Sequence, residues 1–78
     1  MGAVITPAER RALVALGAFN FLAGSLAGNV RIAASDADPL AIHADRALSD
    51  ITSLREVLNE LELAVLCVRA DAAADRAA

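Results

Sequence analysis

The feature that most constrains this fold is a heptad pattern that runs unbroken through the second half of the chain. After Pro39 the sequence contains no glycine or proline, the two residues that most readily interrupt a helix. Apolar side chains recur there alternately every four and three residues, which is the spacing of a helical seam. The pattern predicts a helix from Pro39 to about Ala74. Its seam positions are Leu40, Ala44, Ala47, Ile51, Leu54, Leu58, Leu61, Val65, Val68 and Ala72.

An earlier helix is predicted by a strong N-terminal cap. Thr6 precedes Pro7 and is followed three residues later by Glu9. Thr6 can accept the amide of Glu9 while the Glu9 side chain reaches back to the amide of Thr6. Proline suits the first helical position, because its missing N–H would have no partner there. An apolar stripe continues this helix to about Ala34, through Leu16, Phe19, Ala23, Leu26, Val30 and Ala33.

Two features decide how the helices are connected. Gly28 and Asn29 resemble a helix C-cap, so a kink or an early end of the first helix stays an open alternative. Asp38 before Pro39 fits an N-cap for the second helix, and the turn cluster between the helices is only about four residues long. Connections that short place neighbouring helices antiparallel.

The expected fold is therefore all-α, an antiparallel hairpin of two long helices at about 7–34 and 39–74. A single domain covers 1–78, with frayed ends at 1–5 and 75–78. Hydrophobic residues make up 58% of the 78 residues, and two helices alone enclose no interior in which to bury them. We therefore expect a homo-oligomer, most simply a dimer that forms a four-helix bundle.

Two sets of residues are predicted to make the intermolecular contacts. The C-terminal half of the second helix is apolar on both sides, and a helix of that kind is normally buried. The first helix carries three glycines on one face, which predicts close packing against another helix through that face. The interaction residues are Leu63, Leu66, Cys67 and Ala70 on the second helix, and Gly17, Phe21, Gly24 and Gly28 on the first.

The sequence offers no motif for chemistry. It contains no glycine-rich phosphate loop, no metal-ligand spacing and no nucleophile elbow, so we expect no catalytic site, cofactor or metal. His43 is interpreted as a flank position of the helical seam, and Cys67, with its apolar neighbours, as a buried and inert thiol. The formal net charge of −3 argues against a nucleic-acid partner.

The favoured function is a small oligomerisation and protein–protein interaction module. Such a module would act as an adaptor, regulator or inhibitor of a partner protein, for example as an operon-encoded or phage-encoded accessory factor. A single cysteine without a partner fits the reducing cytoplasm. The alternative is a small membrane-associated protein, holin-like or an anchor, because the segment 12–30 is uncharged and long enough to cross a bilayer. Its three glycines and scattered polar residues argue against insertion.

Overall fold

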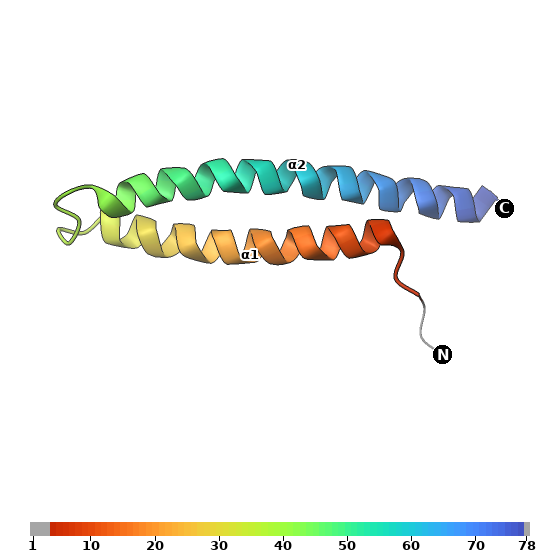
Figure 1. Cartoon of the computed structure of the whole chain (residues 1–78), viewed down its shortest axis with the longest axis horizontal. Helices are drawn as coiled ribbons and strands as arrows, with labels where there is room; N and C mark the ends of the chain where they lie inside the picture. The colour runs from red at the N-terminus through yellow and green to blue at the C-terminus, as the bar shows by residue number, and fades with distance from the viewer. Residues whose placement is uncertain (1–3, 78) are drawn as a thin grey trace.

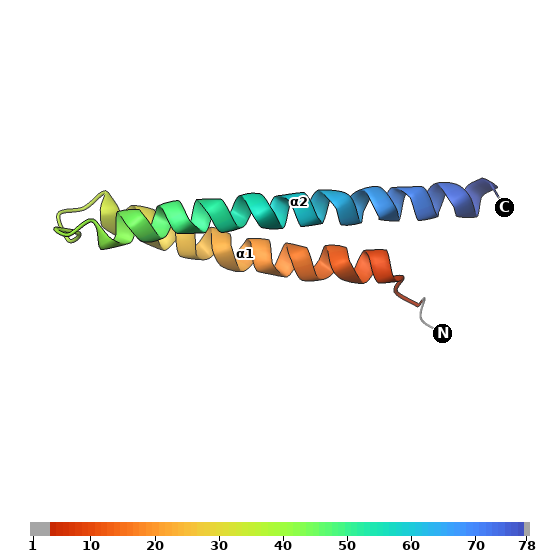
Figure 2. The same ribbon diagram turned by 45° about the horizontal axis from the view of Figure 1, so that its top comes forward.

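The computed structural model describes residues 4–77, which form an antiparallel hairpin of two helices with no strand in that range (Figure 1). Helix α1 spans Pro7–Ala33 and α2 spans Ile42–Ala77. The two lie side by side along the whole of α1, and Figure 2 shows them crossing at a shallow angle. The molecule measures 60 × 25 × 14 Å, so it is a single layer of helices. The predicted all-α hairpin is confirmed.

The start of α1 is the predicted N-cap. Thr6 has extended backbone angles, and its Oγ1 accepts a hydrogen bond from the amide of Glu9 at 3.1 Å. The Thr6 carbonyl accepts the first helical bond, from the amide of Arg10 at 3.0 Å. The helix then continues through Gly28 and ends at Ala33. Of the two alternatives for its course, the structure shows one continuous helix.

The start of α2 was predicted wrongly, by three residues. Pro39 and Leu40 belong to a turn, Ala41 has a positive φ of 56°, and the helix begins at Ile42. Asp38 still caps this helix, but across a longer loop. Its two carboxylate oxygens accept the amides of His43 and Ala44, each at 3.0 Å. These donors, that of His43 foremost, hold the pKa of Asp38 below its ordinary value of 3.8.

The other end of α2 also differs from the prediction. The helix continues to Ala77, three residues beyond Ala74. Residues 75–77 of the segment predicted as frayed are therefore helical. Of the remaining predicted frayed ends, residues 4 and 5 precede the cap without secondary structure, and 1–3 and 78 lie outside the described residues. Apart from Val4 and Ile5, which precede the cap, the described chain is thus two helices and their connection.

The helices meet along a seam of buried and half-buried residues with heptad spacing in both. We call this set the interhelical seam. On α1 it comprises Ala8, Ala12, Ala15, Phe19, Leu22, Leu26, Asn29 and Ala33; on α2 it comprises His43, Ala47, Asp50, Leu54, Val57, Leu61, Ala64 and Val68. The four fully buried residues among the described ones are all alanines, Ala8, Ala15, Ala47 and Ala64. The seam therefore lets the helices approach closely but buries no large side chain completely.

The interhelical seam and the two predicted apolar stripes share every second position. At the positions between, the seam residue comes one residue earlier in the chain than the predicted one. Phe19, Leu26 and Ala33 belong to the predicted stripe and to the seam, but Leu16 and Val30 remain 44% and 49% exposed. On α2 burial replaces 58 and 65 with 57 and 64, whereas the predicted positions Ala44 and Ile51 are half buried, as are His43 and Asp50. Leu58 and Val65 are half exposed as a result. The exposed large residues of the predicted stripes thus point to one side of the contact between the helices.

The Thr6 cap yields a direct prediction. Replacing Thr6 with alanine removes the acceptor for the Glu9 amide and should lower the free energy of unfolding by about 1 kcal/mol. Thermal unfolding followed by circular dichroism measures the loss. The control is Thr52→Ala, because Thr52 bonds only the carbonyl of Leu48 within α2 and alanine is the better helix former. Equal melting temperatures for Thr6→Ala and the unmodified protein would contradict the role of the cap.

Candidate functional site

A polar cluster occupies the interhelical seam near the loop. The Ser25 hydroxyl donates to Asp50 Oδ2 at 2.8 Å, and Asn29 Nδ2 donates to the same oxygen at 3.0 Å. The Asn29 Oδ1 lies 3.0 Å from His43 Nδ1. Because Asp50 can only accept, Asn29 must present its amide nitrogen to Asp50 and its oxygen to His43. With the Asn29 Oδ1 as acceptor, this contact is a hydrogen bond in the tautomer that carries a proton on His43 Nδ1.

The order of these bonds shows what the cluster can do. The imidazole of His43 bonds Asn29 and not the Ser25 hydroxyl, which donates to the Asp50 carboxylate. The cluster joins α1 to α2 at one register. A single polar layer in an otherwise apolar seam commonly fixes register in helical assemblies, because any slip leaves its groups without partners.

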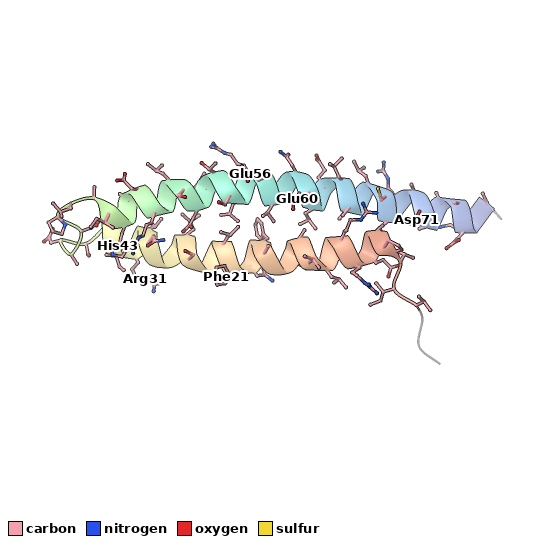
Figure 3. All side chains as sticks on the ribbon, in the orientation of Figure 1. Phe21, Arg31, His43, Glu56, Glu60 and Asp71 are labelled. Atoms are coloured by element: carbon pink, nitrogen blue, oxygen red, sulfur yellow. The ribbon has the colours of Figure 1, made fainter. Side chains whose placement is uncertain are left out.

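Sequence reasoning missed this cluster, although signals for it were present. Ser25 and Asn29 lie one helical turn apart in a segment without charges, and His43 and Asp50 lie seven residues apart. Both spacings place the side chains on one helix face. His43 was interpreted as a flank position of the seam; it is half buried and lies at the loop end of the hairpin (Figure 3).

The cluster predicts strong coupling between Asn29 and Asp50. Asp50→Ala removes the acceptor shared by Ser25 and Asn29 and should cost about 1–3 kcal/mol of stability. In a double-mutant cycle with Asn29→Ala, the coupling energy should reach about 0.5–3 kcal/mol. Denaturant titration measures all four corners of the cycle.

The control for this cycle is Asp71→Ala, which alters an exposed acid on the same helix. It should change stability by less than about 0.5 kcal/mol. Additive effects of Asn29→Ala and Asp50→Ala would show that the two side chains do not interact.

The glycine face of α1 does not pack within the hairpin, so the close helix packing predicted there would have to involve a second chain. A carbon atom added at Gly17, Gly24 or Gly28 would meet nothing within 4 Å. Phe21 is 76% exposed and, with Arg31, points away from α2 (Figure 3). The reason is geometric: the interhelical seam lies on a different face of α1 from the three glycines. Of the four predicted interaction residues on this helix, Gly17, Phe21 and Gly24 are exposed and Gly28 is half buried. Their contact with a partner stays a prediction.

Gly24→Ala should accordingly stabilise the protein. With open space around the added carbon, the gain in helix propensity of about 0.5–1 kcal/mol meets no opposing clash. Chemical denaturation measures it. The reverse change at an exposed position of the same helix, Ala18→Gly, should lose a similar amount. A loss of stability in Gly24→Ala would show that a second chain packs against this glycine.

One side of the hairpin, which we call the groove side, carries a groove of about 760 Å³ between the start of α1 and the second half of α2. Leu63 and Cys67 line it from α2, and Val14 from α1, with Arg10 and Arg11 alongside. Cys67 is exposed, so its prediction as a buried thiol is wrong. It lies next to the seam position Val68 but faces the groove. Of the other predicted interaction residues on α2, Leu63 and Leu66 are 64% and 45% exposed and Ala70 is exposed.

The opposite side carries the large apolar residues that the seam leaves half exposed, and we call it the stripe side. A shallow groove there is lined by Glu9, Ala12 and Leu13 from α1 with Val65 and Val68 from α2. Heptad spacing extends this side along both helices. Its apolar members are Leu13, Leu16, Ala23 and Val30 on α1, and Ile51, Leu58 and Val65 on α2.

Neither side gathers the groups of a metal centre: in the range 4–77, no three histidine, cysteine, aspartate or glutamate side chains are placed to hold an ion together. The candidate sites of this hairpin are therefore its polar cluster and its two exposed sides. Comparison with protein-family models, with curated proteins and with solved structures finds no match to the chain.

Proposed function

We propose that this protein is a helical oligomerisation and protein–protein interaction module. The observation that carries the proposal is the lack of a core in the isolated hairpin, where no large side chain among the described residues is fully buried. Domains ordinarily bury their apolar faces between two or more packed layers. A molecule 14 Å thick has one layer of helices. A second layer must come from another chain.

The accessible surface supports the same proposal. The chain exposes 5949 Å², about a third more than the roughly 4,500 Å² expected for a compact monomer of its mass. Within residues 4–77, fifteen large hydrophobic side chains are exposed, Val4, Phe21 and Leu40 by more than three quarters. Apolar surface on that scale marks an interaction site in a soluble protein.

The wider role we propose is that of an adaptor, regulator or inhibitor that works through this helical surface in the cytoplasm. The predicted interaction residues, among them Leu63, Leu66, Gly24 and Phe21, are accessible on the hairpin. Such a role requires no bound cofactor, because a rigid helical face recognises another helix by its shape and apolar anchors.

The first experiment is the oligomeric state. Light scattering after size exclusion, at micromolar concentration, should give about 16 kDa, twice the chain mass of 8.0 kDa. The sample should be strongly helical by circular dichroism. A folded, helical monomer at that concentration would overturn self-association.

A second candidate function, membrane association, is favoured by one observation. Helix α1 is 27 residues long with a mean hydropathy of 1.5 over its most apolar window, of which 6% is buried. Length and composition therefore suffice for a membrane span. Against this, α2 lies along α1 and carries charged side chains throughout, each costing about 2.5–3.5 kcal/mol at a bilayer centre. Insertion would require the hairpin to open and the bonds to Asp50 to break.

Flotation with vesicles of phosphatidylcholine and phosphatidylglycerol separates the two candidates. The interaction module should stay with the soluble fraction, and the membrane protein should float with the vesicles. The control is Leu22→Arg, which ends the uncharged segment of α1 and would abolish flotation if α1 were the inserted element.

A further inference from the structure

Four large apolar residues of the predicted stripes, Leu16, Val30, Leu58 and Val65, are displaced from the seam in the same direction. On α1 the stripe of Leu16, Ala23 and Val30 lies one residue beyond the seam positions Ala15, Leu22 and Asn29. Moving alternate positions by one residue turns the centre of a stripe by about 50°, half of the roughly 100° between successive residues. On α2 the positions of Ile51, Leu58 and Val65 are displaced from the seam by the same step.

Both displacements point to the stripe side. The shallow groove that joins Ala12 and Leu13 to Val65 and Val68 shows that these positions share one side of the hairpin. The groove that joins Val14 to Leu63 and Cys67 lies on the other. In an isolated pair of helices, apolar stripes point directly at each other. In a four-helix bundle each stripe points at the bundle axis, about 45° from the line to either neighbour.

We infer that a second copy of this chain covers the stripe side, with Leu16, Leu58 and Val65 at the centre of a four-helix bundle. This inference rests on the proposed self-association and assigns it a face. It differs from the sequence-based interface at Leu63, Leu66 and Ala70, which leaves the stripe side unpartnered. The groove side stays accessible in the assembly.

A second copy fits this side in size. Helix α1 is about 40 Å long at 1.5 Å per residue, and two adjacent helices are about 20 Å wide. Covering that area buries on the order of 800 Å² on each copy, which is the standard size of a stable interface. A partner that covers the whole side must itself be two helices wide and equally long, as a second hairpin is.

The charged side chains along the edge of the stripe side are also consistent with a second copy on that side. The stripe side is edged on α2 by Arg55, Glu62 and Arg69, spaced seven residues apart and alternating in sign. Each lies one turn beyond an apolar member of the stripe, at the flank position that borders a neighbouring helix in a bundle. On the groove side, the charged side chains of Arg10, Arg11 and Glu60 line the groove itself, next to Val14 and Leu63.

The test compares matched charge substitutions on the two sides. Leu16→Asp and Leu58→Asp alter stripe-side residues that are 44% and 49% exposed, and Val14→Asp and Leu63→Asp alter groove-side residues of the same helices. The stripe-side changes should weaken the dimer by about 100-fold or more in sedimentation equilibrium, because they place an unpaired charge in a desolvated contact. The groove-side changes should alter the dissociation constant by less than about threefold.

A second measurement leaves the dimer intact and therefore also applies if the separated chains unfold. In a Cys67→Ser background, a single cysteine is introduced by Leu58→Cys or by Leu63→Cys, and its alkylation rate by iodoacetamide is measured in the dimer. The thiol at position 58 should react at least about tenfold more slowly than the one at 63, because the second copy covers it. Dilution below the dissociation constant should remove the difference.

The outcomes separate the inference from the proposal on which it rests. An unmodified protein that is a folded monomer refutes self-association, and the inference with it. A dimer that dissociates on Leu63→Asp, or on changes to both sides, or on neither, overturns the inference while self-association stands. Equal alkylation rates at 58 and 63 in the dimer overturn it too.

Discussion

Two helices in one layer cannot enclose an interior, and the properties of this protein follow from that geometric limit. The interhelical seam consists largely of alanine at its buried points, Ala8, Ala15, Ala47 and Ala64. Small residues allow close approach, but they remove little apolar area from water, and burial of such area is the main source of folding free energy. The larger residues Phe19, Leu22 and Leu54 in the middle of the seam are only half buried. The hairpin as a single chain therefore holds its geometry through caps, helix propensity and one polar cluster.

Much of this fold was predictable because its signals are local. The Thr6 cap, the length of α1 and the helical character of α2 depend on neighbours within a few residues, and the structure confirms each. The predicted heptad positions of α2 are confirmed only in part, because Leu58 and Val65 are half exposed. The loop was less predictable, because the pair Asp38-Pro39 is compatible with two geometries. Asp38 can cap a helix that begins at Pro39, or reach the amides of His43 and Ala44 over a turn. A positive φ at Ala41, which alanine rarely adopts, belongs to the second geometry and has no sequence signal.

The candidate site was harder to predict for a different physical reason. Periodicity identifies the apolar stripe of a helix, and the stripe was assumed to face the nearest helix. The seam instead passes through Asn29, His43 and Asp50, because these polar groups satisfy one another across the two helices. Their pairing cannot be read from either helix alone. The glycines misled for a related reason: a small residue in a helix predicts close approach only if another helix lies on that side, and for Gly24 none in this chain does.

The polar cluster and the displaced stripe depend on each other. Asp50 holds Ser25 and Asn29 at one register, and that register sets which residues of the α1 stripe lie next to Leu58 and Val65 of α2. A slip of one heptad would keep the apolar periodicity but would leave Asp50 opposite apolar residues, at the cost of an unpaired carboxylate in the seam. Two helices bonded by apolar contacts alone could take several such registers at similar free energy. The polar layer selects one of them, and in doing so it combines two half-exposed stripes into a single continuous surface wide enough for another pair of helices.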